Sequence, residues 1–285
     1  MLTPLAHPMN QPVLNVKSLQ RTYGSRMALR DVSFAVGRGE TVALLGASGS
    51  GKSTLIRCLC GLETSDPGTG SVEVFGRPLQ TAGRNSPEIR TLRRRIGVIF
   101  QQFNLVGRLG VMQNVLTGLA AAVPLWRGVS GRYTLEQQAR ALEALETIGL
   151  APQAFQRAST LSGGQQQRAA IARVLVQGAE LVLADEPVAS LDPKSTIRVM
   201  DQLAALNRDA GLTLVISLHQ VSLARRYCAR VIALRDGELV YDGPSAALTP
   251  SFLQQLYGTA AGELLHDDHA EPEAPIEVTP LALAA

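Results

Sequence analysis

The residues with the clearest chemical signature form a glycine-rich segment with the pattern G-x-x-x-x-G-K-[ST]. The glycines let backbone N–H groups curl around phosphate oxygens without Cβ clashes, and the helix expected to follow offers its positive N-terminal end. Lys52 can neutralise β- and γ-phosphates, and the Ser53 hydroxyl can ligate Mg²⁺. Because an apolar strand pattern precedes the segment, we expect a P-loop for ATP and Mg²⁺ and not a chance turn. The residues expected at the nucleotide are Gly46, Ala47, Ser48, Gly49, Ser50, Gly51, Lys52, Ser53 and Thr54.

Two adjacent carboxylates stand at the end of an apolar run farther along the chain. Residues 181–184 read LVLA, and Asp185 and Glu186 follow directly. On its own, such a pair is best interpreted as solvated, but a P-loop fold commonly uses a second strand to bring a carboxylate to its metal ion. We therefore expect Asp185 to hold the Mg²⁺ hydration shell and Glu186 to polarise the water that attacks the γ-phosphate.

A third motif, LSGGQQQR at residues 161–168, offers a second cradle for an anion. Its Ser-Gly-Gly turn opens a predicted helix, whose N-terminal end attracts negative charge. Here the sequence resembles the ATP-binding-cassette (ABC) family, whose signature motif is LSGGQ. The resemblance implies that the P-loop of one chain and the signature of a second copy enclose each ATP, in a head-to-tail dimer with two composite sites. The signature residues expected at the nucleotide are Ser162, Gly163, Gly164 and Gln165.

The resemblance assigns roles to four further residues, which occur in the order that the family has. Tyr23 stands where an aromatic ring stacks on adenine, and a core tyrosine is the alternative. Gln101 matches the glutamine that senses the γ-phosphate and its metal ion and contacts the transport partner; we prefer it to Gln102 because it directly follows the last aromatic residue of its strand. Asp192 matches the loop that crosses the dimer interface. His219 matches the histidine that contacts the γ-phosphate. A lone histidine is usually structural, but this one follows the carboxyl end of a predicted parallel strand, where ligand sites collect.

Strand patterns that alternate with helical patterns predict an α/β fold. Residues 41–45, 181–184 and 213–217 are mostly apolar runs, which suit parallel strands covered on both faces. An Asp-Gly turn within residues 231–241 predicts a hairpin. Together with the resemblance, these patterns predict a P-loop NTPase with a RecA-like core and a mixed sheet, a helical subdomain and an N-terminal antiparallel β-subdomain.

Composition divides the chain into a core and two ends. We expect a flexible leader at 1–11, an ABC ATPase domain at 12–261 with its helical subdomain at about 105–165, and a disordered tail at 262–285. The tail is acidic, rich in Ala and Pro, and without hydrophobic periodicity. Within the helical subdomain, four apolar residues recur at helical spacing and predict one buried helix face. They are Leu135, Leu142, Leu145 and Ile148.

Composition also limits the classes of function. The net charge is only +3, so the chain as a whole is not a polyanion binder and no nucleic acid is expected as a partner. The basic cluster at residues 90–95 is expected to be a solvated helix face, with a contact to a partner or to phosphate as the alternative. Three cysteines match neither a disulfide framework nor a zinc pattern, and we expect them to be reduced and buried. No signal peptide and no apolar run of ~20 residues is evident, so another chain is expected to cross any membrane at which this one works.

Finer resemblance points to importers of small polar solutes. Residues 100–106 (FQQFNLV) resemble the ATPases of such importers in general. Residues 157–160 (RAST), 184–193 (ADEPVASLDP) and 218–221 (LHQV) are similar to the ATPase subunits of bacterial phosphonate importers, whose relatives handle phosphite or phosphate esters. The resemblance implies integral membrane permease subunits as partners, a peripheral location at the cytoplasmic face of the cell (inner) membrane, and indirect work with a periplasmic or extracellular solute-binding protein. No residue of this chain would touch the solute, so an amino acid or another small polar solute is an alternative cargo. A non-transport ABC ATPase acting on nucleic acid or ribosomes is the alternative of another class, based on the basic cluster.

Overall fold

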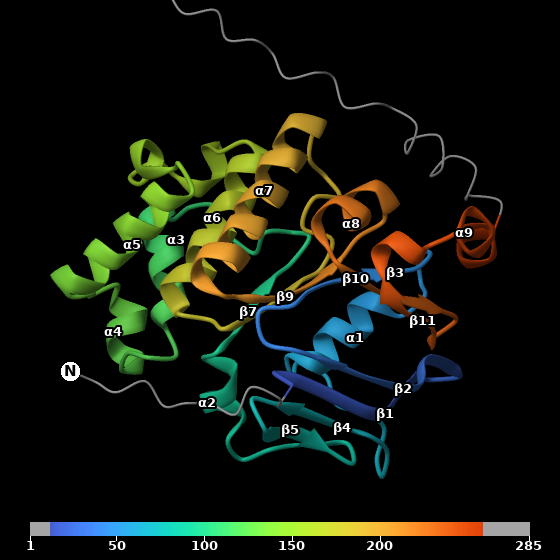
Figure 1. Cartoon of the computed structure of the whole chain (residues 1–285). Coiled ribbons are helices and arrows are strands. Elements are labelled where there is room, and N and C mark those ends of the chain that lie inside the picture. The colour runs from blue at the N-terminus through green and yellow to red at the C-terminus, as the bar shows by residue number, and fades with distance from the viewer. Residues whose placement is uncertain (1–11, 259–285) are drawn as a thin grey trace, which may run out of the picture.

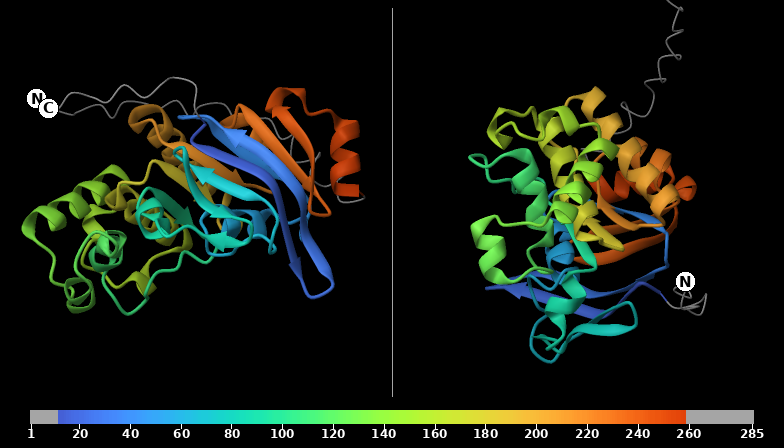
Figure 2. Two further views of the ribbon diagram at one scale, coloured as in Figure 1. Left: turned by 90° about the horizontal axis from the view of Figure 1, so that it is seen from below. Right: turned by 90° about the vertical axis from the view of Figure 1, so that its left-hand side faces the viewer.

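The computed structural model describes residues 12–258, in which two β-sheets lie on either side of one short helix, α1 (Lys52–Leu59) (Figure 1). The helices α6 (Gly163–Gln177), α7 (Pro193–Ala210) and α8 (Val221–Tyr227) lie on the far face of the larger sheet, and the helices of residues 111–147 form a lobe to one side of it (Figures 1 and 2). The expected leader at 1–11 and tail at 262–285 lie outside the described residues.

The smaller sheet is antiparallel, with the strand order β2-β1-β4-β5-β6. Its inner face carries the buried side chains of Leu14, Val16 and Leu19, and its outer face is polar. This alternation is the pattern of a sheet that is covered on one side only. The strands are β1 (Leu14–Tyr23), β2 (Arg26–Val36), β4 (Ser71–Val74), β5 (Arg77–Thr81) and β6 (Arg84–Asn85).

The larger sheet has the order β11-β10-β3-β9-β8-β7, and all its pairs are parallel except β10 with β11. The three predicted buried strands are present with the predicted bounds and lie next to one another, in the order β3-β9-β8. Their carboxyl ends therefore meet at one edge of the sheet, where ligand sites of α/β folds collect. The strands are β3 (Thr41–Leu45), β7 (Ile96–Ile99), β8 (Leu181–Ala184), β9 (Thr213–Ser217), β10 (Arg230–Arg235) and β11 (Glu238–Pro244).

The predicted hairpin is confirmed by β10 and β11. Asp236 and Gly237 join the two strands with φ values of 50° and 81°. Positive φ at both central residues is what a two-residue turn needs to match the twist of the strands it joins. The mixed sheet of the predicted fold class arises from this pair.

Alternate residues of β3 divide the molecule into two hydrophobic cores. Val42 and Leu44 pack into the core between the two sheets, together with α1. Ala43 and Leu45 pack into the core beneath the helices. Both faces of the strand are buried, which is why its sequence is continuously apolar.

The helices lie between the two sheets, on the far face of the larger sheet, and in the helical lobe beside it (Figures 1 and 2). The α-helices are α1 (Lys52–Leu59), α2 (Ile89–Arg93), α3 (Val111–Leu116), α4 (Leu125–Ser130), α5 (Leu135–Thr147), α6 (Gly163–Gln177), α7 (Pro193–Ala210), α8 (Val221–Tyr227) and α9 (Pro250–Tyr257). Four 3₁₀ turns are η1 (Thr117–Leu119), η2 (Ala151–Gln153), η3 (Ala158–Thr160) and η4 (Ser245–Ala247). No helix of the described chain is long and apolar enough to cross a membrane.

One expectation for α5 is wrong. Leu145 and Ile148 are buried as predicted, but the side chain of Leu135 is 85% exposed, and Leu142 is only partly buried. Leu135 is the first residue of the helix, directly after the cap formed by Thr134. The helical period is correct, but the contacts of α5 with α3 and α6 do not cover this first residue.

Side chains of the basic cluster stabilise the fold. Arg93 donates hydrogen bonds to the carbonyl oxygens of Cys60 and Gly61, which follow the end of α1. Arg95 pairs with Glu180, and its guanidinium lies 3.7 Å from the ring centroid of Phe75. Two of the four arginines at 90–95 therefore have internal roles, and the cluster is not simply a solvated face.

The cysteines are unpaired and buried, as predicted. Burial raises the pKa of the Cys58 and Cys228 thiols to about 12. Thiols with such pKa values stay protonated at neutral pH and are therefore poor nucleophiles and poor metal ligands.

Candidate active site

The P-loop connects the end of β3 to the start of α1. At Gly46, with φ 147°, a Cβ atom would lie 2.2 Å from the carbonyl oxygen of Leu234. At Gly51, with φ 107°, it would lie 2.5 Å from the carbonyl oxygen of Ala28. Both positions therefore need glycine for two reasons, the left-handed backbone and the close approach of another strand.

Lys52, the first residue of α1, is only 4% exposed. Its ammonium group donates to the carbonyl oxygens of Gly46 at 2.6 Å and Ala47 at 3.2 Å. Desolvation by burial lowers the pKa of Lys52, and the nearby carboxylates of Glu186 and Asp185 oppose this shift. The ammonium lies inside the turn of the P-loop, where a β- or γ-phosphate is expected.

The serine that follows contacts the predicted metal carboxylate. The Ser53 hydroxyl donates to Oδ1 of Asp185 at 3.0 Å, and Asp185 is 8% exposed at the end of β8. A hydroxyl and a carboxylate are the hard oxygen donors that Mg²⁺ prefers when phosphate groups supply its other ligands. These two residues therefore fit the ion. Gln101, the third predicted ligand, is exposed in the turn after β7 and is not brought into contact with them.

Glu186 and His219 meet at the carboxyl ends of the adjacent strands β8 and β9. Nε2 of His219 lies 2.5 Å from Oε1 of Glu186. Glu186 has a left-handed backbone, with φ 47°, so the chain turns sharply at this point. The contact gives His219 a partner within the predicted site and not in the core.

A cavity of about 380 Å³ brings Glu186 together with Lys52 and Ser53 of the P-loop, whereas Asp185 and His219 are not among its lining residues. Tyr23 lies at this cavity and is 39% exposed, so it is not a core tyrosine. Its hydroxyl donates to the Glu63 carboxylate, and the Arg21 guanidinium lies 4.8 Å from its ring centroid. The lining comprises Tyr23, Arg26, Ala28, Ser48, Gly49, Gly51, Lys52, Ser53, Thr54 and Glu186.

Three of the four signature residues, Ser162, Gly164 and Gln165, line a second cavity, of about 260 Å³. Ser162 is the N-cap of α6, and its hydroxyl accepts the backbone N–H of Gln165, whose side-chain oxygen accepts the N–H of Ser162. This reciprocal capping box fixes the first turn of α6. Asp192 caps α7 by accepting the backbone N–H of Ser195. Hydrogen bonding to the Ser195 side chain, and then to this N–H, lowers the pKa of Asp192.

Cationic side chains surround the signature cavity. Arg168, Lys194 and Arg198 line it, and none of the ion pairs found in residues 12–258 involves them. Burial lowers the pKa of Arg168, and the neighbouring charge of Arg198 contributes to the shift. Asp192 also lines this cavity, so three cationic side chains face one carboxylate. This net positive charge beside two helix N-termini suits a phosphate-bearing ligand. The signature cavity and the P-loop cavity share no lining residue, so each copy has two separate cradles.

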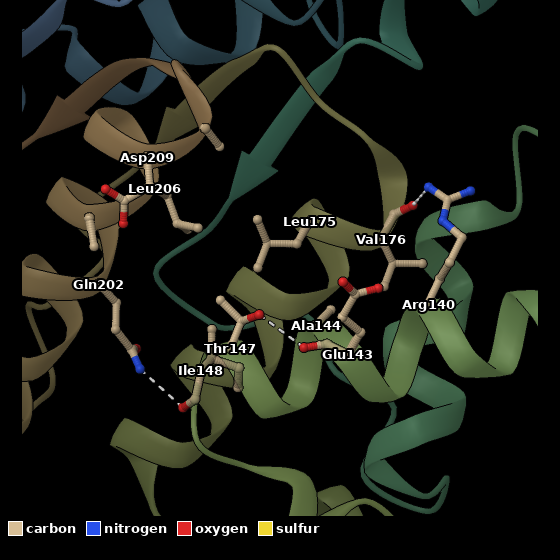
Figure 3. A pocket seen from close by; sticks show the side chains of 12 residues that line it. Arg140, Glu143, Ala144, Thr147, Ile148, Leu175, Val176, Gln202, Leu206 and Asp209 are labelled. Atoms are coloured by element: carbon tan, nitrogen blue, oxygen red, sulfur yellow. Dashed lines mark hydrogen bonds between the residues drawn. The ribbon is translucent and has the colours of Figure 1, made fainter.

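A further cavity, of about 480 Å³, lies between α5, α6 and α7 (Figure 3). Gln202 reaches the carbonyl oxygen of Ile148 at its edge, and Arg140 reaches that of Val176. No residue of the three motifs lines it, so it is not part of the nucleotide site.

The structure adds three residues that the sequence did not single out. Arg26 lines the P-loop cavity and donates to the carbonyl oxygen of Gly49 at 2.9 Å. The hydroxyl of Tyr257 lies 3.3 Å from the backbone nitrogen of Gly46. The Ser217 hydroxyl donates to the Asp185 carboxylate and accepts the backbone N–H of Glu186. Only Ser217 left a signal in the sequence, as a hydroxyl at the end of an otherwise largely apolar strand.

Comparison with known proteins agrees with these motifs. The sequence profile of the family described as "ABC transporter" matches residues 29–189. The chain is 58% identical over 250 residues to the "Phosphonates import ATP-binding protein PhnC" of Cupriavidus pinatubonensis, covering 87% of this chain and 89% of that one. A relative of the same name from Stutzerimonas stutzeri is 53% identical over 264 residues, covering 92% and 96%.

Solved structures give the same result for the fold. A dimeric ATP-binding cassette in a post-hydrolysis state with ADP and Pi is 35% identical, with a TM-score of 0.69, and covers 82% of this chain and 100% of that chain. A cassette from Clostridium perfringens, part of an ABC transporter complex, is 26% identical with a TM-score of 0.72, covering 91% and 98%. The chain therefore belongs to the ABC transporter family, and it is an ATP-hydrolysing cassette of that family.

Proposed function

We propose that this chain hydrolyses ATP to energise the uptake of a phosphonate, or of a related phosphite or phosphate ester. One observation carries the catalytic part: Ser53 with Asp185, and Glu186 with His219, meet beside the P-loop at one edge of the sheet. The cargo is supported by relatives named as phosphonate importers, which are more than half identical and cover nearly the whole chain.

The geometry supports a division of labour among the residues of one nucleotide site. Lys52 and the P-loop amides bind and neutralise phosphate oxygens, and Tyr23 lies where it can stack on adenine. Ser53 and Asp185 would hold Mg²⁺, which supplies charge neutralisation on the phosphates. Glu186 orients the attacking water and His219 holds the Glu186 carboxylate in place, with Nε2 2.5 Å from Oε1.

The signature of a second copy completes the site in this proposal. Its Ser162 and the N-terminal turn of α6 face the γ-phosphate, and Asp192 lies at the dimer interface. The separation of the two cavities within one chain supports this arrangement, as do the dimeric forms of similar cassettes. Closure of the dimer moves the exposed turn that carries Gln101. There a helix of the permease, at the cytoplasmic face of the membrane, is shifted from one state to the other. ATP drives this change because it binds the closed state more tightly. A solute-binding protein delivers the cargo to the permease.

The catalytic assignment is tested with Glu186→Gln. This variant keeps the shape and hydrogen-bonding groups of the side chain but removes the base, so ATP binding stays at the wild-type level and turnover falls by about 10³-fold. Binding is measured with a fluorescent ATP analogue and turnover by phosphate release. Hydrolysis by the variant at the wild-type rate would refute Glu186 as the base.

The cargo is tested by reconstituting the chain with its permease and solute-binding protein in vesicles. We expect ATP-dependent uptake of a radiolabelled alkylphosphonate. Uptake of an amino acid instead, with no phosphonate transport, would refute the cargo but leave the ATPase assignment intact.

The alternative of an ABC ATPase that acts on nucleic acid has lost part of its basis, because Arg93 and Arg95 of the basic cluster contact the protein itself.

A further inference from the structure

A fully buried hydroxyl connects the carboxylate of Asp185 to the backbone of Glu186. Ser217, the last residue of β9, is 0% exposed. Its hydroxyl donates to Oδ1 of Asp185 at 3.0 Å and accepts the backbone N–H of Glu186 at 2.7 Å. A serine hydroxyl has one proton and two acceptor positions, so one side chain serves both neighbours without conflict.

The contact with Glu186 bears on its backbone. Glu186 has φ 47°, a left-handed conformation that is uncommon for a residue other than glycine and needs support from its surroundings. The Ser217 oxygen provides that support through the N–H of Glu186, and His219 holds the carboxylate of the same residue. Both contacts come from the end of β9, so this strand end sets the direction of the Glu186 side chain.

The contact with Asp185 bears on the metal site. Oδ1 of Asp185 accepts two hydroxyl protons, from Ser53 and from Ser217. Ser53 belongs to the P-loop and is the hydroxyl expected to turn to Mg²⁺, whereas Ser217 lies at the end of a core strand. Ser217 is therefore the donor that keeps the carboxylate oriented when Ser53 ligates the ion.

We propose that Ser217 is a positioning residue that fixes the metal-binding carboxylate of Asp185 and the base Glu186 in their positions relative to each other. The inference rests on the proposed hydrolysis of Mg-ATP at this site. It requires that the loss of the hydroxyl affect the metal-dependent part of nucleotide binding as well as turnover. Removing a buried hydrogen bond to a charged group has effects of about 10- to 100-fold.

The test compares Ser217→Ala with Ser217→Thr and with Thr213→Val in the full-length chain. Thr213 is the matched control, because it lies on the same strand, is 1% exposed, and accepts the N–H of Gly39 through its hydroxyl at 3.0 Å. Both Ser217→Ala and Thr213→Val remove a buried hydroxyl from β9, but only Ser217 contacts the site. Ser217→Thr restores the hydroxyl.

Two readouts distinguish positioning from a structural role. The first is the affinity for a fluorescent ATP analogue with Mg²⁺ and with EDTA, and the second is kcat against KM for ATP. We expect Ser217→Ala to lower kcat by about tenfold or more and to reduce the gain in affinity from Mg²⁺, while affinity in EDTA is unchanged. Thr213→Val lowers only the melting temperature, and Ser217→Thr recovers kcat.

The inference is overturned if Ser217→Ala and Thr213→Val both lose stability and both keep the wild-type kcat and Mg²⁺ dependence. Because thermal unfolding is recorded for every variant, reduced folding is separated from an effect on the site. A wild-type chain that binds ATP but does not turn it over would instead refute the proposed hydrolysis, and the inference with it.

Discussion

The hydroxyl of Tyr257, the last residue of α9, lies 3.3 Å from the backbone nitrogen of Gly46, the first glycine of the P-loop. These residues are separated by 211 positions in the chain. Burial raises the pKa of Tyr257 to about 12, so its hydroxyl is protonated at neutral pH. The C-terminal helix therefore supports the nucleotide-binding loop directly, by accepting the N–H of Gly46.

Tyr257→Phe removes this support without changing the ring. The buried N–H of Gly46 loses its partner, so we expect the free energy of unfolding to fall by about 1 kcal/mol. The P-loop is then less preorganised, and the KM for ATP rises several-fold with little change in kcat. Urea unfolding and steady-state ATPase assays measure the two effects.

The control for this change is Tyr241→Phe. The Tyr241 hydroxyl donates to the carbonyl oxygen of Pro244, and its ring packs against Phe252 of α9, 5.2 Å between centroids. The Tyr241→Phe variant therefore removes a hydroxyl beside the same helix but away from Gly46. Equal KM values for both variants would show that α9 contributes only to stability.

The ion pair between Arg95 and Glu180 predicts a pH dependence of stability. Hydrogen bonds from Arg95, more than any other cause, lower the pKa of Glu180 below its usual 4.5. A depressed carboxylate pKa stabilises the fold above the unfolded value, and this stabilisation is lost as the pH falls through the lower folded value. Both side chains are about one-third exposed, so the pair contributes only about 0.5–1 kcal/mol.

Glu180→Gln should therefore destabilise the protein at neutral pH and have a shrinking effect as the pH falls below 4.5. The measurement is the urea midpoint of both proteins across this pH range. Glu238→Gln is the control, because Glu238 is exposed and forms none of the ion pairs found within residues 12–258. A constant difference between Glu180→Gln and wild type at every pH would contradict the linkage.

The parts of the site that the sequence predicted are those encoded by short segments. The P-loop, the Asp185–Glu186 pair and the signature turn each need residue types that only neighbours in sequence supply. Tyr257 and Ser217 are different, because each acts on a residue that only the folded chain brings near. A buried tyrosine has no local pattern that separates this role from ordinary packing. A serine at the end of an apolar strand marks a position of interest but does not show which residues it contacts.

In the helical lobe, the sequence likewise predicted the helix period but not which residues of the periodic face are buried. Helical periodicity correctly identified the buried face at Leu145 but could not show where the neighbouring helices stop covering it, so it also included Leu135. Contacts of α5 with α3 and α6 bury Leu145 completely, whereas Leu135 precedes that contact and is 85% exposed. Whether an apolar residue on the periodic face is buried depends on how far the neighbouring helices extend, and the sequence periodicity of one helix carries no information about that.

This difference predicts opposite outcomes for one substitution at two positions of the same helix. Leu145→Ala removes a fully buried side chain and leaves a cavity, so the free energy of unfolding should fall by about 2–5 kcal/mol. Leu135→Ala removes an exposed side chain and should change it by less than about 0.5 kcal/mol. Chemical denaturation followed by circular dichroism compares the two directly. If Leu135→Ala proved as destabilising as Leu145→Ala, the exposed position of Leu135 at the start of α5 would be wrong, and the periodic pattern would have been right along its whole length.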